Sequence, residues 1–338
     1  MKRSNKVERI VLAYSGSVNT TVAIQWLAER YGAEIVTITL DVGQRAGLEA
    51  TRDRALAAGA RRAHVIDARD EFARDFIVPA LRAGAVTSEG LPLVSALTRP
   101  IIAKHLVAIA RLERAAAVAH GGDGSDRRCL ESLVGDLDPS LIVLAPVRDW
   151  TFTPGELVAY ARTQRLPIGG IEPDALDANL WGRSLARWSS SPDCAADVEV
   201  AFEEGVPVAV NGVSLPLVEL ITSVEAIAGS HGVGEPAPAA TVLHEAHRAL
   251  QACVTPPDVD RSARARGADY ADLVTAGGWY SPARQAGDDY AATVQKHVTG
   301  TARLKIFNGQ SEVVECRSPF ALSTVDARRP TAAVAAGS

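Results

Sequence analysis

The first half of the chain alternates short apolar runs with segments of helical periodicity, and this alternation limits the possible folds more than any other feature. The runs are rich in β-branched residues, and apolar residues recur at every third or fourth position between them. Strands that alternate with helices form a parallel sheet with helices on both faces. The pattern predicts five strands, at residues 10–13, 35–40, 64–66, 117–119 and 141–144, with helices that include residues 20–31, 97–112 and 154–164.

The second half of the chain follows a different pattern. Residues 172–196 are rich in Pro, Asp and Ser, which is typical of a loop. Beyond them we expect a strand at 206–210, helices at 217–228 and 242–253, and a strand pair at 301–314 that turns at Asn308-Gly309. The chain is therefore predicted to contain an α/β domain at residues 1–168, an α+β domain at 169–325 and a flexible tail at 326–338.

The composition excludes several classes of protein. Hydrophobic residues make up 47% of the 338 residues and the net charge is −5, so the chain has no basic surface for nucleic acid or anionic lipid. The four cysteines form no CxxC pair, which argues against structural zinc and a disulfide framework. No apolar stretch is long enough for a signal peptide or a membrane span. We expect a cytoplasmic protein with neither nucleic-acid nor membrane partners.

A loop of small and hydroxyl-bearing residues follows the first predicted strand and enters the first predicted helix. It reads Ser15-Gly16-Ser17-Val18-Asn19-Thr20-Thr21. The carboxyl ends of parallel strands form the ligand site of such a sheet, and a helix N-terminus offers unpaired N–H groups to an anion. Small residues let the backbone approach a phosphate closely, and hydroxyls add donors. The loop indicates phosphate binding, with simple capping of the helix as the alternative.

Histidines suggest two further sites. His244 and His247 lie three apart on a predicted helix, but no third ligand has suitable spacing, so we predict no protein-built metal centre. His120 ends a predicted strand beside the hydroxyl-rich loop. It either contacts phosphate or acts as an acid, or else makes a structural hydrogen bond.

Several motifs resemble, in collinear order, those of the argininosuccinate synthase family. The opening Val11-Leu12-Ala13-Tyr14-Ser15-Gly16 and the later Asp41-Val42-Gly43-Gln44 resemble the start of these enzymes, whose loop reads SGG-x-D-T-S. The likeness spans about residues 8 to 320 and includes residues 97–104, 118–121, 179–184, 228–234 and 279–282. It implies an α/β domain of adenine nucleotide alpha hydrolase-like fold, built on a parallel five-stranded sheet, and a second, synthetase-type α+β domain.

The resemblance also implies a reaction with ATP and Mg²⁺ as cofactors. In this family the ureido oxygen of citrulline attacks the α-phosphorus of ATP, pyrophosphate leaves, and the amine of aspartate then displaces AMP. The matching motifs assign nucleotide binding to Ala13, Tyr14, Ser15, Gly16, Ser17, Asn19, Thr20, Thr21 and Gly121. They assign catalysis to Arg99 and Asp126, and substrate binding to Ser95, Arg99, Asp123, Ser125, Asp126 and Ser184.

The chain departs from the family in its nucleotide loop. Ser17 stands in place of the second glycine, Asn19 in place of the aspartate and Thr21 in place of the closing serine. Asn keeps a carbonyl oxygen but lacks the charge that a hard cation prefers. We therefore expect ATP binding that is weaker and more dependent on Mg²⁺ than in the family.

The departures are larger at the substrate site. Leu91 and Ala96 replace hydroxyl-bearing residues that hold citrulline, and Asp123 replaces a neutral threonine. The family's aspartate-binding arginine falls on Cys129, so that Arg127 or Arg128 either substitutes for it or is simply solvated. Between Gly234 and Thr241 the chain keeps only residues 235–240, where the family has a much longer segment that binds the α-amino group of citrulline.

Two hypotheses follow from these departures. The first is an AMP-forming ligase for an amino-acid-like substrate other than citrulline, in specialised metabolism. The second is a degenerate homologue that binds a nucleotide weakly or binds a partner, which the loss of the aspartate at position 19 favours. In either case we expect a homo-oligomer, a dimer or a tetramer.

Overall fold

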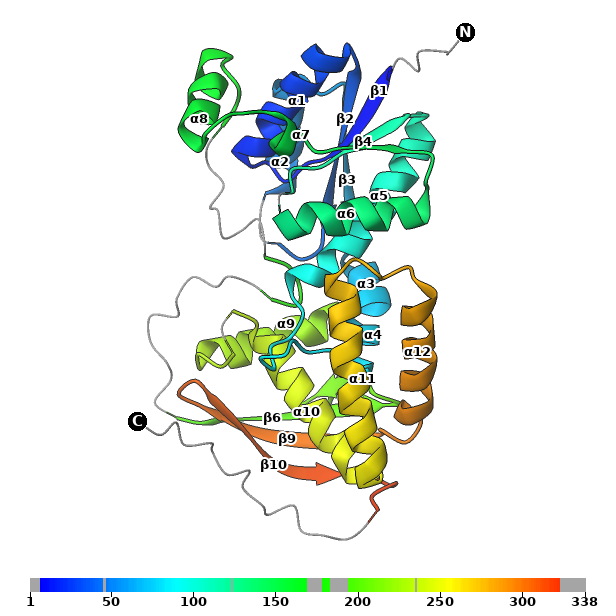
Figure 1. Ribbon diagram of the computed structural model, residues 1–338. Helices are drawn as coiled ribbons and strands as arrows, with labels where there is room; N and C mark the ends of the chain where they lie inside the picture. The colour runs from blue at the N-terminus through cyan, green and yellow to red at the C-terminus, as the bar shows by residue number, and fades with distance from the viewer. Residues whose placement is uncertain are drawn as a thin grey trace, which may run out of the picture.

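The first half of the chain forms the predicted parallel sheet. The computed structural model describes residues 7–44, 47–122, 124–168, 178–182, 194–234 and 236–322. The sheet has the strand order β3-β2-β1-β4-β5, with every neighbouring pair parallel (Figure 1). The prediction of a five-stranded parallel sheet is therefore confirmed. Its strands are β1 (Arg9–Ala13), β2 (Glu34–Asp41), β3 (Arg62–Asp67), β4 (Ala117–Ala119) and β5 (Ile142–Leu144).

Helices cover both faces of this sheet because successive residues of a strand point to opposite sides. Ile10 and Leu12 of β1 pack with Leu27 in one core, whereas Val11 packs with Leu97 and other residues in a second core. This two-sided burial explains why the strands read as continuous apolar runs. The helices of this half are α1 (Val18–Tyr31), α2 (Leu48–Ala57), α5 (Ser95–Glu113), α6 (Gly124–Leu137), α7 (Pro146–Asp149) and α8 (Pro154–Thr163).

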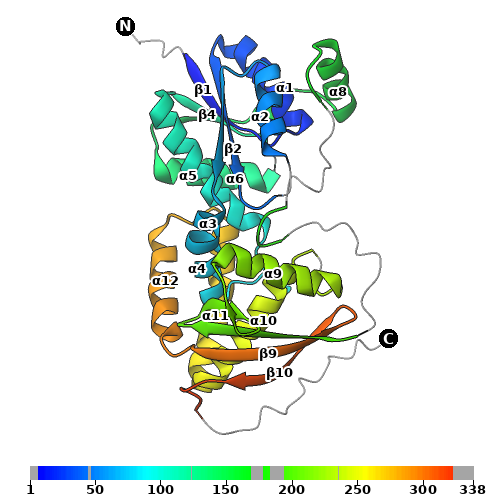
Figure 2. The ribbon, with the colours of Figure 1, turned by 180° about the vertical axis from the view of Figure 1, so that it is seen from behind.

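The second half forms an antiparallel sheet of order β10-β9-β6-β7-β8, as expected for an α+β domain. The predicted hairpin is present, and Asn308 and Gly309 turn it with φ of 47° and 79°. Helices α9 and α10 pack on this sheet (Figure 2). The elements are β6 (Ala196–Glu203), β7 (Val206–Val210), β8 (Val213–Ser214), β9 (Gly300–Phe307), β10 (Gln310–Arg317), α9 (Leu217–Ser230), α10 (Pro238–Val254), α11 (Pro257–Thr275) and α12 (Pro282–Gln295).

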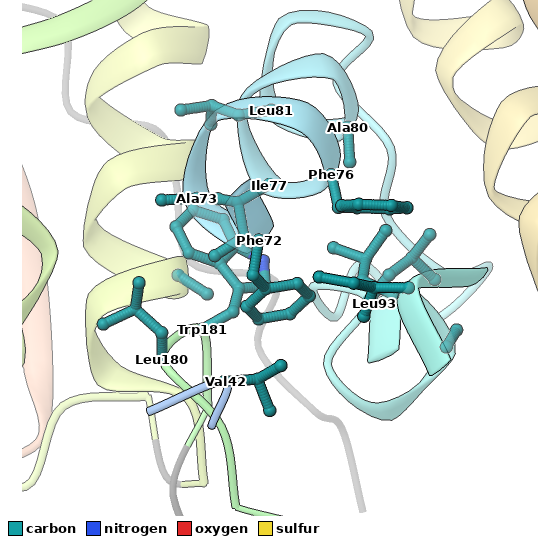
Figure 3. Packing of buried hydrophobic residues seen from close by; sticks show 14 of the residues in the cluster. Val42, Phe72, Ala73, Phe76, Ile77, Ala80, Leu81, Leu93, Leu180 and Trp181 are labelled. Carbon is teal, nitrogen blue, oxygen red and sulfur yellow. The ribbon is translucent and has the colours of Figure 1, made fainter. Parts of the chain in front are cut away.

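One helical segment of the first half packs against the second half. It runs as α3 (Arg69–Phe72), a π-helical turn η1 (Ala73–Ile77) and α4 (Val78–Arg82), and it lies against α9, α10 and α12. Figure 3 shows Phe72, Phe76 and Ile77 of this segment gathered with Leu93 and Trp181. The segment therefore joins the two halves in one core, while the boundary near residue 168 stays a prediction.

Candidate nucleotide and substrate site

The candidate site lies where the order of the parallel sheet reverses. β1 and β4 are neighbours, and the chain continues from them to opposite edges of the sheet. A crevice forms at the carboxyl ends of two such strands, and ligands of open α/β sheets bind there. Two loops begin at these strand ends: residues 14–17 after β1 and residues 120–122 after β4.

The loop after β1 places three hydroxyl groups around the start of α1. Ser15 Oγ lies 3.1 Å from Ser17 Oγ and 3.2 Å from Thr20 Oγ1, and the Ser17 and Thr20 hydroxyls are 3.1 Å apart. Ser17 is also the N-cap of α1, because its Oγ accepts a hydrogen bond from the Thr20 N–H. Capping and phosphate binding are thus compatible, since one cap leaves other N–H groups of the first turn available.

Two glycines let the backbone form this crevice. Gly16 has a φ of 82°, in the left-handed region that favours glycine. At Gly121, after β4, a Cβ would lie 2.7 Å from Thr20 Cγ2, so only glycine lets this loop approach α1 so closely. The first glycine matches the family pattern quoted above, and the second follows the strand end at His120.

The remaining residues assigned to nucleotide binding have different surroundings. The Tyr14 and Thr21 hydroxyls are buried and form a hydrogen bond of 3.0 Å, which links the start of the loop to the first turn of α1. Ala13 and Tyr14 contribute to the wall of a cavity. Asn19 is exposed on the first turn of α1, and its side chain has no hydrogen-bond partner within the described residues.

His120 is a buried neutral imidazole beside the loop. Its Nδ1 accepts a hydrogen bond from the Gly122 N–H at 3.2 Å, which leaves the proton on Nε2. Burial lowers the pKa of His120 to about 4, so the ring is uncharged at neutral pH and is a poor source of protons. Nε2 is buried and has no partner within the described residues, which makes it a free hydrogen-bond donor.

The two residues assigned to catalysis form an ion pair. Arg99 on α5 bonds through Nη2 to Oδ1 of Asp126 on α6 at 2.5 Å. Ser125 Oγ lies 3.4 Å from the same carboxylate oxygen. The Arg99 side chain is only 14% exposed, whereas Asp126 is 44% exposed, so the pair lies at the mouth of the site.

Two cavities meet at Arg99. A cavity of about 210 Å³ runs from the loop after β1 to Asp126, with apolar walls from β2 and α5 that suit a nucleotide base. A larger cavity of about 720 Å³ lies between the loop at residues 83–94 and helix α10. Ser95 and Arg99 line both. The structure thus brings Ser95, Arg99, Ser125 and Asp126 together, as the motifs imply.

Other candidate residues are placed differently or not described. Asp123 and Ser184 lie outside the described residues. Arg127 is paired with Glu131 at 3.1 Å, and Arg128 is exposed. His247 bonds Gln295 at 2.7 Å, and the described residues include no group of three or more His, Cys, Asp or Glu side chains that could hold a metal ion.

Two features of the site were not found from the sequence. Arg54 on α2 reaches the loop after β1, where its Nη1 lies 3.5 Å from the Gly16 carbonyl oxygen. Helix α10 lines the larger cavity with Thr241, His244, Glu245, Arg248 and Gln251. Their spacing of three to four residues signals one helix face, but only tertiary packing brings that face to Arg99.

A parallel sheet with a hydroxyl-rich loop at its reversal point, facing an ion pair across a cavity, defines a nucleotide-binding α/β protein. The family models described as the Arginosuccinate synthase N-terminal HUP domain and C-terminal domain match residues 9–167 and, in two pieces, 180–237 and 235–328. The chain belongs to the argininosuccinate synthase family. The prediction of an ATP-using carbon–nitrogen ligase family is confirmed at this level.

Two curated argininosuccinate synthases support the same membership. Argininosuccinate synthase of Rubrobacter xylanophilus is 39% identical over 94% of this chain and 88% of its own. That of Symbiobacterium thermophilum is 40% identical over 94% of this chain and 90% of its own. Among solved structures, the NMN synthetase from Francisella tularensis aligns over 51% of this chain and 68% of its own, with a TM-score of 0.35 and 14% identity. Within the described residues, no helix is both long and apolar enough to cross a membrane.

Proposed function

We propose that the protein is an ATP-dependent, AMP-forming ligase that activates an oxygen of a ureido, amide or carboxyl group on a donor other than citrulline. The observation that carries this proposal is the meeting of the two cavities at Ser95 and Arg99. A nucleotide in the smaller cavity and an oxygen donor in the larger one would both reach these residues. Adenylation needs this arrangement, because most of its catalysis comes from holding two reactants in line.

The residues around the smaller cavity fit ATP. The left-handed Gly16, the close approach at Gly121 and the N–H groups of α1 form a cradle for phosphate oxygens, and Ser15 and Ser17 add hydroxyl donors. When bound, ATP supplies the α-phosphoryl group that activates the donor oxygen. His120 would donate a neutral hydrogen bond through Nε2, and Arg99 would stabilise negative charge that develops between the two cavities.

Mg²⁺ fits the site mainly through ligands other than the protein. Near the loop, the described residues offer the Asn19 amide oxygen and, across the cavity, the Asp126 carboxylate. An ion held by so few protein oxygens would take its other ligands from phosphate and water, as Mg²⁺ commonly does. We expect ATP binding to depend strongly on Mg²⁺ for this reason.

Three features favour a donor other than citrulline. Leu91 lines the larger cavity and is 54% exposed, so an apolar surface stands where the family has a hydroxyl. Ala96, which also lines it, cannot donate a hydrogen bond. The C-terminal family model matches in two pieces that meet at residues 235–237, the position of the segment missing between Gly234 and Thr241. Each unmet buried hydrogen bond would cost citrulline about 1–3 kcal/mol.

The test is release of pyrophosphate by the purified protein with ATP and Mg²⁺. Citrulline with aspartate at millimolar levels is compared with a panel of ureido, amide and carboxyl donors, and AMP and the coupled product are identified by mass spectrometry. We expect turnover with a panel member and little with citrulline. Robust formation of argininosuccinate would contradict the proposal and assign the protein to arginine biosynthesis.

A second candidate function is supported by Asn19. With no carboxylate at this position the protein would bind nucleotide without turnover, as a degenerate homologue. Calorimetric titration with ATP and Mg²⁺ separates the two functions: binding without pyrophosphate release from any donor favours the second. A role in specialised metabolism and assembly into a dimer or tetramer belong to the first proposal and await genomic context and measurement of mass in solution.

A further inference from the structure

The larger cavity has more room than an amino acid needs. Its volume of about 720 Å³ lies well within the range of pockets that hold drug-sized ligands. Ser95 and Arg99 line it together with the smaller cavity. A face of α10 also lines it, with Thr241, His244, Glu245, Arg248 and Gln251 on that face.

Polar groups on this face lack partners. Glu245 accepts a hydrogen bond from Ser311 with Oε2, but Oε1 has no partner among the described residues. His244 Nε2 is buried and likewise unpartnered there. Arg248, one turn from His244, is exposed and makes no ion pair with Glu245 or any other described carboxylate. A carboxylate and a guanidinium thus line one cavity without forming an ion pair with each other, although the Arg248 charge partly offsets the effect of burial on the Glu245 pKa.

Burial of the Glu245 carboxylate favours binding of a cation beside it. It raises the pKa of the Glu245 carboxyl, because an ionised carboxylate is poorly solvated in this wall. A bound ammonium group would compensate that carboxylate, and a bound carboxylate would pair with Arg248. The two charges that an α-amino acid carries on one carbon match this pair of side chains.

We propose that the Glu245 and Arg248 side chains of α10 bind the α-ammonium and α-carboxylate groups of the oxygen donor, with His244 as a further hydrogen-bond partner. The inference rests on the proposed ligase function and adds to it the α10 residues that hold the head of the donor, in a donor whose side chain is longer than that of citrulline. This head site replaces the one that the missing segment provides in the family.

The apolar part of the cavity wall favours a long apolar stem in the donor. Val86, Leu91, Pro92 and Val94 line the cavity from the loop before α5. Methylene groups packed on these side chains are removed from water, which favours binding. The substrate therefore spans from α10 to Arg99 with its polar groups at the two ends.

The test measures binding to the full-length protein by calorimetry without ATP. The probes are L-citrulline, L-homocitrulline and the next longer ω-ureido-α-amino acid, each also as its N-acetyl derivative and its methyl ester. We expect at least one longer probe to bind more tightly than citrulline. Its N-acetyl form, which lacks the ammonium charge, and its methyl ester, which lacks the carboxylate, should each bind at least tenfold more weakly.

Four variants assign these losses to residues. Glu245→Gln should weaken binding of the free amino acid at least tenfold and leave binding of the N-acetyl form unchanged. Arg248→Gln should weaken binding of the free amino acid and leave binding of the methyl ester unchanged. Ser311→Ala removes the internal partner of Glu245 and should bind as tightly as the parent or more so. Glu312→Gln, an exposed carboxylate on β10, is the matched control and should change nothing.

Three results would overturn the assignment: no binding of any probe, equal binding of charged and blocked probes, or equal effects of both α10 variants on all forms. Thermal unfolding of each variant excludes loss of fold as the cause. Charge-selective binding without pyrophosphate release would remove the ligase function and keep the α10 site. If the α10 variants release pyrophosphate at the rate of the parent, the ligase function is kept and the α10 site is removed.

Discussion

The two cavities that share Ser95 and Arg99 are built from different parts of the protein. The proposed phosphate loop beside the smaller cavity depends on backbone: the left-handed Gly16, the close approach at Gly121 and the first turn of α1. The larger cavity is lined mostly by side chains of α10 and of the loop before α5. A backbone-built site keeps its shape when a neighbouring side chain changes, whereas a side-chain-built site changes its specificity with each substitution. A family can therefore keep its nucleotide chemistry while one member changes substrate.

Arg99 lines both cavities, so its substitution should have the largest effect on activity. Arg99→Met should reduce pyrophosphate release about 10³-fold with whichever donor is active, because Arg99 is the one charged residue among the described residues that line both cavities. Arg99→Lys should recover little of the rate, because an ammonium cannot reproduce the fork of the guanidinium. The measurement is initial-rate kinetics at saturating ATP.

Arg128→Met is the control for Arg99, because this exposed arginine lies on α6 near Asp126. It should leave the rate within a factor of two or so of the parent's, as expected for a solvated side chain. If both variants lose activity equally, Arg99 has no special position between the cavities. If Arg99→Met also lowers the melting temperature by many degrees, the unpaired Asp126 contributes to the loss.

Two buried groups, one in each half, should also respond differently to acid. In the first half, burial opposes ionisation of Glu113, but hydrogen bonds from His64 and Arg62 outweigh it and lower the Glu113 pKa below its usual 4.5. In the second half, burial lowers the pKa of His247 to about 4. The unfolded His247 takes up a proton near pH 6.5, so its contribution to stability declines from pH 6.5 downward, whereas that of Glu113 is kept until below pH 4.5.

We expect the free energy of unfolding to fall between pH 6.5 and pH 4, by up to about 3 kcal/mol from His247 alone. His247→Gln keeps a donor for Gln295 Oε1 and should flatten this slope, while His297→Gln, at an exposed site, should not. Urea titrations across this pH range provide the measurement. A slope that His247→Gln leaves intact would show that another group controls acid unfolding.

The contrast between backbone and side chains also explains how much the sequence could predict. The strand–helix alternation and the Asn308-Gly309 turn are local patterns, and the parallel sheet and the β9–β10 hairpin follow from them. Strands β6 and β8 of the second sheet were not predicted. The loop at Ser15–Thr21 was recognisable because its chemistry is contiguous. Arg54 and the α10 face were not, because tertiary packing brings them to the site. The packing of residues 69–82 against the second half was not predicted either, because apolar periodicity does not indicate which element a helix packs against.

Gly121→Ala tests the backbone-built site directly. The added Cβ would lie 2.7 Å from Thr20 Cγ2, so the loop after β4 or the start of α1 must move. We expect a loss of about 1–3 kcal/mol in stability and roughly tenfold or more in ATP affinity. Gly135→Ala is the control, because a Cβ there meets nothing within 4 Å and the residue lies inside α6. Equal effects of the two variants would refute the idea that the cradle depends on this close approach.

The smallest predicted change concerns the nucleotide loop and restores a family residue. Asn19→Asp adds a charge on the exposed first turn of α1, where the positive end of the helix dipole stabilises a carboxylate by about 0.3–1 kcal/mol. It also provides Mg²⁺ with an anionic oxygen, which a hard cation prefers to an amide. ATP affinity in the presence of Mg²⁺ should therefore rise by up to about tenfold, whereas affinity without Mg²⁺ should fall because the new charge repels phosphate. Asn19→Ala, which offers no oxygen, should weaken binding only when Mg²⁺ is present. Calorimetric titrations of the three proteins with and without the ion separate these effects, and an Asp variant that binds ATP no better with Mg²⁺ would show that position 19 does not face the metal.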